Sequence, residues 1–257
     1  MTDPSQGFST DLSGQVALVT GTTSGLGRRF AQVLAAHGAK VALTGRRVER
    51  LAELEKEIQA SGGQCASFPL DMTDADNILS VAAEVEQALG TISILVNNAG
   101  IPDAKYSTQM SGELIDDVIG TNLRGPYILS CEVARRLIKK KQPGRMVNIS
   151  SIGAFTYEGH GAALYSMTKS AIARMTDVLA VEWAKFHINV NCIAPGLFES
   201  EMTDGMLERM GDFSRDNPRK RIGRAHQLDS TLLYMVSPSS DAVTGTTIKV
   251  DDGQTPR

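Results

Sequence analysis

The chain has 257 residues, 42% of them hydrophobic, which is enough to bury one large α/β core. Its formal net charge of −3 gives no electrostatic reason to expect nucleic acid or an anionic membrane surface as a partner. The three cysteines are widely scattered and the four histidines show no ligand spacing. We therefore expect no disulfide, no metal site, and a reducing, cytoplasmic compartment. No apolar run approaches the roughly 20 residues of a membrane span, and no secretory signal is visible.

Short apolar, β-branched runs alternate with longer segments of helical period along the whole chain. The runs are apolar nearly throughout, which is typical of parallel strands covered on both faces. Strands are predicted at residues 15–20, 40–45, 65–70, 92–98, 145–150, 188–195 and 246–251. Amphipathic segments lie between them, such as residues 46–63, where Leu51, Leu54 and Ile58 share one face. This alternation predicts one domain over residues 1–257, a doubly wound (Rossmann) sheet of about seven parallel strands with helices on both faces.

One segment, residues 196–225, interrupts the alternation. It is polar and turn-rich, and it follows the predicted strand at 188–195. An insertion at the C-terminal end of a parallel strand lies on the side where such sheets bind ligands, so we interpret it as a substrate loop. Met202, Met206 and Met210 recur in it every four residues and either form an adaptable apolar lid or pack a short helix.

A glycine-rich loop follows the first predicted strand. Gly21, Gly25 and Gly27 in "TGTTSGLG" permit a tight turn and a close backbone approach, and the helix that starts here offers free N–H groups to a pyrophosphate. The spacing alone also fits a plain strand-to-helix turn. Its position between the first strand and the first helix of an alternating chain favours a dinucleotide site.

Tyr165 and Lys169 stand four residues apart, so one helical face would carry both. A free tyrosine has a pKa of about 10, and a nearby ammonium is expected to lower it by favouring the tyrosinate. Ser150 and Ser151 precede the pair at the end of a predicted strand. A phenol, an ammonium and a serine hydroxyl together form an acid–base device for a carbonyl oxygen.

These motifs, taken in order, resemble the short-chain dehydrogenase/reductase family. The resemblance rests on "TGTTSGLG", "NNAG" at 97–100, the Ser151, Tyr165 and Lys169 set, and "APG" at 194–196, and it extends over residues 12–253. The segment "PGLFESEMT" is similar to the 3-oxoacyl-acyl-carrier-protein reductase branch. By resemblance, Ser151 rather than Ser150 orients the carbonyl, Tyr165 donates the proton, and Lys169 tunes Tyr165 and binds the cofactor ribose. Asn122 would bend its helix and hold a water that links Lys169 to solvent, whereas its residue type alone also fits a solvent-facing position.

The resemblance also implies a nicotinamide cofactor held along the C-terminal ends of the strands. Asp71 and Met72 would lie at the adenine, although Asp71 could instead cap a helix in competition with Thr73 or Asp74. The remaining implied cofactor contacts, besides Tyr165 and Lys169, are Gly21, Thr23, Ser24, Gly25, Leu26, Gly27, Asn98, Ala99, Gly100, Ile193 and Ser200.

The end of the second strand distinguishes NADP(H) from NAD(H). An acidic residue there would select NAD(H), but this chain has Gly45 followed by Arg46 and Arg47. The helix dipole disfavours two cations at the start of a helix, so their presence indicates an anionic ligand such as the 2′-phosphate of the cofactor. NADP(H) bound by Arg46 is therefore predicted, with NAD(H) as the alternative if Glu49 pairs with the arginines.

The sequence thus predicts an NADP(H)-dependent carbonyl reductase that interconverts a ketone and a secondary alcohol. The substrate is a small molecule, either a 3-oxoacyl thioester or a hydrophobic carbonyl compound. Alternatives are an NAD(H)-dependent alcohol or hydroxysteroid-type dehydrogenase, a non-catalytic nucleotide-binding scaffold, and an epimerase or dehydratase on the same fold. The complete Ser–Tyr–Lys set counts against the last two. The resemblance further implies a homotetramer or homodimer.

Overall fold

The computed structural model describes residues 7–157, 159, 161–212 and 214–255. These residues form one seven-stranded sheet in the order β3-β2-β1-β4-β5-β6-β7, with every neighbouring pair parallel. Each predicted strand is present within one residue at either end, so the predicted doubly wound sheet is confirmed. The strands are β1 (Val16–Thr20), β2 (Lys40–Gly45), β3 (Gln64–Pro69), β4 (Ile92–Asn97), β5 (Gly144–Ile149), β6 (Ile188–Pro195) and β7 (Thr247–Val250).

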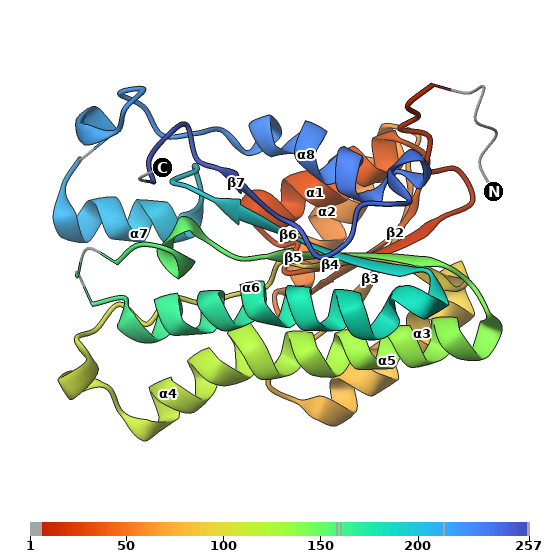
Figure 1. Ribbon diagram of the computed structural model, residues 1–257, viewed down its shortest axis with the longest axis horizontal. Coiled ribbons are helices and arrows are strands. Elements are labelled where there is room, and N and C mark those ends of the chain that lie inside the picture. The colour runs from red at the N-terminus through yellow and green to blue at the C-terminus, as the bar shows by residue number, and fades with distance from the viewer. Residues whose placement is uncertain (1–6, 158, 160, 213, 256–257) are drawn as a thin grey trace.

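Two layers of helices sandwich the sheet, which explains why the strands are apolar throughout (Figure 1). Along β1, Ala17 and Val19 pack into one core cluster, and Val16 and Leu18 pack into the cluster on the opposite face. Truncating a side chain such as the fully buried Leu18 to Ala would cost about 2–5 kcal/mol. The first face is covered by α1 (Gly25–Ala36), α2 (Val48–Ala60) and α8 (Asp229–Val236), and the second by α3 (Ala75–Leu89), α5 (Gly125–Lys140) and α6 (Ala163–Trp183).

The remaining helical segments lie outside this sandwich. Helix α4 (Gly112–Ile119) runs through a π-helical turn, Gly120–Arg124, into α5. The segment 196–225 contains α7 (Glu201–Met210), so the methionines stand on a short helix. Within the described ranges, no helix combines the length and the apolar character that a membrane span requires. Short 3-10 turns lie at Ser107–Gln109, Ile152–Ala154, Ala184–Phe186, Ser214–Asp216, Ala225–Leu228 and Pro238–Ser240.

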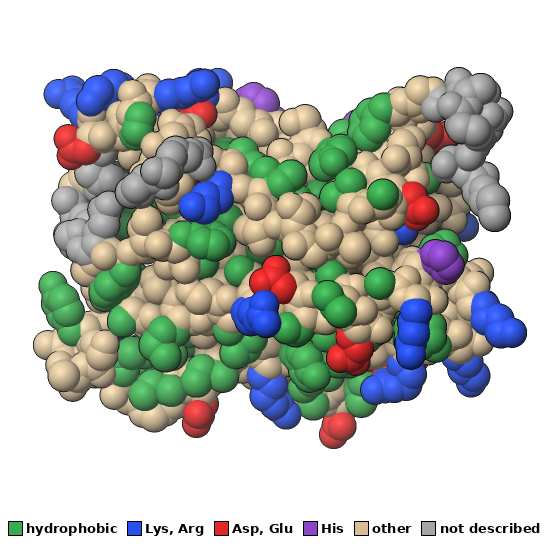
Figure 2. All heavy atoms as spheres, viewed as in Figure 1, with side chains coloured by type: hydrophobic (Ala, Val, Ile, Leu, Met, Phe, Trp, Pro, Cys, Tyr) green, Lys and Arg blue, Asp and Glu red, His purple; other side chains and the backbone are tan. Residues whose placement is uncertain are grey.

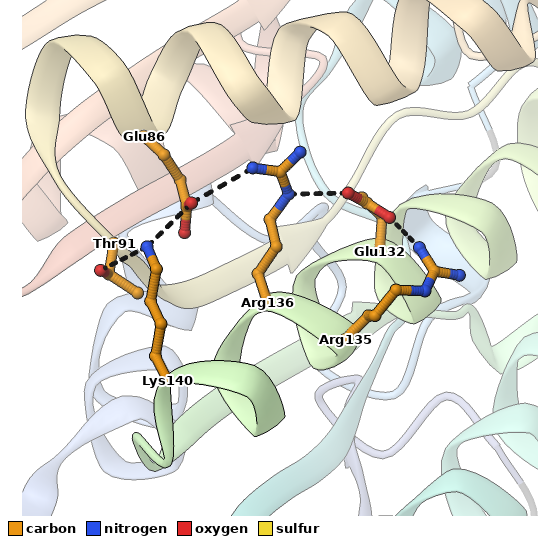
Figure 3. Close-up of polar contacts among 6 residues, drawn as sticks. All are labelled: Glu86, Thr91, Glu132, Arg135, Arg136 and Lys140. Carbon is orange, nitrogen blue, oxygen red and sulfur yellow. Dashed lines mark hydrogen bonds and ion pairs between the residues drawn. The ribbon is translucent and has the colours of Figure 1, made fainter.

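An ion-pair network joins α3 to α5 on the face opposite α1 (Figure 3). The Glu86 carboxylate accepts hydrogen bonds from Lys140 at 2.9 Å and from Arg136 at 3.2 Å. Arg136 also donates to Glu132 at 2.7 Å. Burial by itself would raise the pKa of Glu86, but the hydrogen bonds from Lys140 and Arg136 outweigh it and lower that pKa. The network therefore ties the two helices together through a charged carboxylate.

Candidate active site

A cleft of about 1130 Å³ opens where the C-terminal ends of β1, β2, β4, β5 and β6 meet. Parallel doubly wound sheets bind ligands at this edge, where the strand order reverses on either side of β1. A second hollow of about 590 Å³ lies beside α7 and contains none of the predicted site residues. The predicted residues that line the cleft are Gly21, Thr23, Ser24, Gly25, Leu26, Arg46, Asp71, Met72, Asn98, Ala99, Gly100, Ser151, Tyr165, Lys169 and Ser200.

Three predicted residues do not line the cleft. Gly27 and Asn122 lie behind its wall, with roles described below. The side chain of Ile193 is fully buried in the core beneath α1 and α8, and its carbonyl accepts the N–H of Ser150 at 2.8 Å. The structure therefore does not bring the Ile193 side chain to the cofactor cleft. β6 is an interior strand, and this side chain packs into the core between the sheet and helices α1 and α8.

The glycine loop is folded so that α1 presents an uncapped N-terminus to the cleft. Gly21 has φ +73°, which favours glycine, and a Cβ on Gly27 would lie only 2.2 Å from the Gly21 carbonyl oxygen. Ser24 precedes α1 but makes no side-chain cap, and the first turn holds no acidic residue. This arrangement fits the pyrophosphate of a dinucleotide, whose oxygens can accept the free N–H groups.

Asn98, at the end of β4, fastens this loop to the sheet. Its Nδ2 donates to the carbonyl of Thr20 at 2.9 Å and to that of Gly21 at 3.2 Å. Its backbone N–H donates to the Thr20 hydroxyl at 2.9 Å. The side chain lines the cleft as predicted, but in this structure its amide group holds the glycine loop in shape.

Arg46 and Asp71 lie at the β2–β3 end of the cleft, where the adenosine half of the cofactor is expected. Arg46 is exposed, and its charge helps to lower the pKa of Asp71. The larger cause is the backbone hydrogen bond from Thr73, at 2.9 Å. Asp71 is not the cap of α3, because Asp74 accepts the N–H groups of that helix's first turn.

Arg47 is held by groups that are far away in the sequence. Its guanidinium donates to Thr23 at 2.8 Å and to Ser24 at 2.9 Å, both on the glycine loop. It also pairs with Glu201 of α7 at 3.0 Å, and Arg50 pairs with the same carboxylate. Arg47 therefore pairs with Glu201, and not with Glu49, which the sequence offered as an alternative partner for Arg46 or Arg47. No local sequence pattern predicts this contact, since 154 residues separate its partners.

The two serines after β5 have different partners. Ser150 is buried and donates its hydroxyl to the carbonyl of Lys169 at 2.7 Å. Ser151 lines the cleft together with Tyr165, and the interaction of its side chain with the phenol acts to lower the pKa of Tyr165. Ser151 also accepts the N–H of Gly153 at 3.1 Å, which fixes its rotamer. The structure thus brings Ser151, and not Ser150, to the phenol.

Tyr165 and Lys169 share one face of α6, with the Lys169 Nζ atom 5.6 Å from the centre of the Tyr165 ring. The ammonium is buried and donates to the carbonyl of Ile149 at 2.8 Å. Burial lowers the pKa of Lys169 to about 8. Burial also raises the pKa of Tyr165, and the interaction with Ser151 opposes that rise only in part. The expected lowering of the Tyr165 pKa by Lys169 is therefore wrong for the protein by itself, because desolvation of the phenol dominates.

Asn122 lies inside the π-helical turn and is buried, so the solvent-facing alternative is wrong. Its Oδ1 accepts the N–H of Ile101 at 2.8 Å, and its Nδ2 donates to the Ile101 carbonyl at 2.9 Å. Nδ2 also lies 3.3 Å from the Thr168 hydroxyl on α6. A π-helical turn interrupts the regular hydrogen-bond ladder at the position where the family resemblance implies a bend.

Sequence reasoning missed Asp103, a buried carboxylate on the loop that follows β4. Its Oδ2 accepts the backbone N–H groups of Leu164 and Tyr165 at the start of α6. His160, for which the sequence favours a solvated loop position over a place at the substrate mouth, lies outside the described residues. Within the described part of the chain, no group of three or more His, Cys, Asp or Glu side chains is placed to hold a metal ion.

Comparison with known proteins agrees with this geometry. Residues 15–211 match the family model for short chain dehydrogenases. The chain is 34% identical to gluconate 5-dehydrogenase of Gluconobacter oxydans (strain 621H), covering 95% of this chain and 96% of that protein. It is also 34% identical to a 3-oxoacyl-acyl-carrier-protein reductase of Thermotoga maritima, covering 94% of this chain and 98% of that protein.

The fold is also similar to that of a solved structure. The gluconate 5-dehydrogenase of Burkholderia cenocepacia J2315, in complex with NADP and tartrate, superposes with a TM-score of 0.89 at 29% identity, covering 95% of this chain and 96% of that one. The two relatives with identical 34% scores differ in the substrate class that they are named for, so similarity alone does not select a substrate. The chain belongs to the short-chain dehydrogenase family, as its motifs indicated, and is an oxidoreductase acting on CH–OH and C=O groups.

Proposed function

We propose that this protein interconverts a ketone and a secondary alcohol with NADP(H) as cofactor. The observation that carries the proposal is that Ser151, Tyr165 and Lys169 line the same cleft as the glycine loop. A purely nucleotide-binding scaffold would have no use for two hydroxyls and a buried lysine at this place. An epimerase or dehydratase would need a second acid–base pair, which the sequence does not offer.

The residues of the chain would divide the work as follows. Bound NADP(H) supplies the hydride for reduction or accepts it in oxidation. Ser151 holds the substrate oxygen by a hydrogen bond, and Tyr165 donates a proton to that oxygen as its negative charge develops. The raised pKa keeps Tyr165 protonated at neutral pH, which suits a proton donor. The buried Lys169 is one turn away and can hydrogen-bond the cofactor ribose.

Asn122 supports this arrangement from behind the cleft wall. Its side chain reaches Thr168, whose hydroxyl donates to the Tyr165 carbonyl at 2.8 Å. It also holds Ile101 at both backbone groups. We assign it the role of a support for α6, together with the proton relay that the family resemblance implies.

The cofactor is NADP(H) because the adenosine end of the cleft offers a cation and no acid at the selective position. Gly45 stands at the end of β2, and a Cβ there would lie 2.9 Å from Cγ2 of Thr23, so an acidic side chain would not fit without movement. Arg46, the next residue, is exposed and lines the cleft. A 2′-phosphate is the anion that a guanidinium at this place binds well.

The substrate end of the cleft lies under α7. Apolar side chains such as Leu197, Met202 and Met206 line it and support a 3-oxoacyl thioester or another hydrophobic carbonyl compound. A second candidate is a hydroxy acid of the kind for which the Gluconobacter relative is named. Arg209, which lines the same cleft and is exposed on α7, favours this candidate because it offers a cation for a carboxylate.

We also propose a homodimer or homotetramer formed through α5 and α6. Tyr127, Met167, Val178 and Val181 expose 43% to 80% of their surface on these helices. Figure 2 shows hydrophobic side chains gathered over this part of the molecule. The apolar residues of α6 thus form two faces, one packed on the sheet and one turned outward. Several large apolar side chains exposed together on the surface of one subunit are typical of an interface between subunits.

Ligand-induced thermal stabilisation tests the function. NADPH at about 100 times its Kd should stabilise the wild type by about 2.7 kcal/mol, and NADH should stabilise it less. Arg46→Ala should remove most of the NADPH preference, whereas Arg174→Ala, which removes an exposed arginine outside the cleft, should not. A survey of ketones with NADPH then compares the wild type with Tyr165→Phe. Equal or greater stabilisation by NADH would contradict NADP(H), and no stabilisation by either would contradict the nucleotide-dependent function.

A further inference from the structure

Helix α6, which carries Tyr165 and Lys169, has no cap of its own. Ala162 occupies the N-cap position and has no side chain that could accept a hydrogen bond, and the first turn contains no acidic residue. The free N–H groups of a helix start are costly to leave unsatisfied near a buried site. The sequence around residue 162 therefore leaves the first turn of the catalytic helix without local support.

Asp103 supplies this cap although it lies 61 and 62 residues before the two residues whose N–H groups it accepts. Its Oδ2 accepts the N–H of Leu164 at 2.9 Å and that of Tyr165 at 3.1 Å. These are the second and third residues of α6, the positions that an N-cap side chain normally satisfies. One of the two N–H donors belongs to Tyr165 itself, so the carboxylate fixes the backbone from which the phenol extends.

The carboxylate is in turn rigidly held. Asp103 is 3% exposed, and its Oδ1 accepts the N–H of Ala104 at 2.9 Å. The backbone of Lys105 is packed so closely on Gly161 that a Cβ on the glycine would lie 2.9 Å from the Lys105 carbonyl carbon. Two residues before Asp103, Asn122 holds Ile101 by its N–H and its carbonyl. The loop is thus fastened on both sides of the carboxylate.

We propose that Asp103 is a positioning residue for the reaction: through the first turn of α6 it sets the place of the Tyr165 hydroxyl against Ser151. This inference rests on the proposed function and adds a residue to it.

The charge of Asp103 has a second consequence. Burial is the main cause of the raised pKa of Tyr165, and the negative charge of Asp103 acts in the same direction. The carboxylate thus helps to keep Tyr165 as a neutral proton donor.

The other groups around Tyr165 do not replace Asp103. Among the described residues, Lys169 is the cation beside the ring, and it donates to Ile149 rather than to the phenol. Cys192 on β6 interacts with Lys169, and burial raises the pKa of its thiol, so it adds no charge at neutral pH. Ser151 is uncharged. Asp103 is therefore the negative charge that acts on the Tyr165 titration.

Two variants separate the cap from the charge. Asp103→Asn keeps an oxygen that can accept the Leu164 and Tyr165 N–H groups but removes the charge and the acceptor of the Ala104 N–H. Asp103→Ala removes the charge and both acceptors. Asp74→Ala is the matched control, because Asp74 caps α3 through the N–H groups of Asp76 and Asn77. Three readouts are amide exchange of Leu164 and Tyr165 by NMR, ultraviolet titration of tyrosinate with Tyr165→Phe subtracted, and the pH profile of turnover.

We expect Asp103→Ala to speed exchange of the Leu164 and Tyr165 amides by roughly fivefold or more, as loss of a cap implies. Its turnover should fall by about 100-fold through misplacement of the phenol. Asp103→Asn should keep slow exchange but shift the Tyr165 titration, and the alkaline limb of ketone reduction, to lower pH. Asp74→Ala should lower the stability of the protein without changing the amide exchange of Leu164 and Tyr165 or the titration of Tyr165.

Unchanged exchange in Asp103→Ala would overturn the capping role, and an unchanged titration in Asp103→Asn would overturn the role of the charge. Equal turnover of the wild type and Asp103→Ala would overturn the positioning role. The exchange and titration experiments need neither cofactor nor substrate. If both behave as expected and the wild type reduces no ketone, the proposed function fails while the placement of Tyr165 by Asp103 stands.

Discussion

Substituting Gly27 with Ala tests the glycine loop most directly. The added Cβ would lie 2.2 Å from the Gly21 carbonyl oxygen and 2.3 Å from Nδ2 of Asn98. The first distance is 0.8 Å shorter than the 3.0 Å that real Cβ contacts keep. Neither the Gly21 carbonyl oxygen nor Nδ2 of Asn98 can move away easily, because both are hydrogen-bonded. They hydrogen-bond to each other at 3.2 Å, and Asn98 also binds Thr20. The methyl group would therefore force apart the contact that joins β4 to the loop.

Overpacking of this kind costs about 1–3 kcal/mol. At about 2–4 °C per kcal/mol for a chain of this size, the melting temperature should fall by roughly 2–12 °C. Stabilisation by NADPH should largely disappear, because the loop would no longer present its N–H groups to the pyrophosphate. The measurement is thermal unfolding with and without NADPH.

Gly112→Ala is the matched control. Gly112 is the first residue of α4, and no atom lies within 4 Å of a Cβ added there. The free energy of unfolding of this variant should therefore rise by about 0.4–1 kcal/mol. Equal melting temperatures and equal NADPH stabilisation for Gly27→Ala and the wild type would refute the steric argument. A loss of stability with unchanged NADPH stabilisation would refute the role of this loop in cofactor binding.

Two further predictions concern charged side chains. Glu201→Gln should free Arg47 and Arg50 and tighten NADPH binding by up to about fivefold in low salt, since exposed pairs are worth at most about 1 kcal/mol. Titration calorimetry at two salt concentrations measures this, and weaker binding would indicate that Glu201 itself contacts the cofactor. The pKa of Glu86 is lowered in the folded protein, so its stabilisation is present above its unfolded pKa of about 4.3 and is lost as the pH falls through the folded value. Glu86→Gln should therefore lower stability at pH 7 and flatten its acid dependence, and parallel pH curves for both proteins would contradict the role of the network.

The sequence by itself determined the sheet and the chemical groups of the site. Leu18 and Val19 are both buried because β1 is covered on both faces, and an apolar run without alternation encodes that arrangement directly. The spacing of Gly21, Gly25 and Gly27 encodes a turn, and the spacing of Tyr165 and Lys169 encodes a shared helical face. These features depend on residues a few positions apart, so local periodicity is sufficient to predict them.

Only the tertiary structure decided which groups act on one another. Asp103 reaches Tyr165 across 62 residues, and Glu201 reaches Arg47 across 154, because both contacts depend on how α6 and α7 pack against the strand ends. The same packing partly desolvates the Tyr165 phenol and turns Lys169 toward Ile149, so the pKa of Tyr165 rises where the spacing suggested a fall. Desolvation is set by every element that surrounds a group, and the spacing of two residues on one helix contains no information about it.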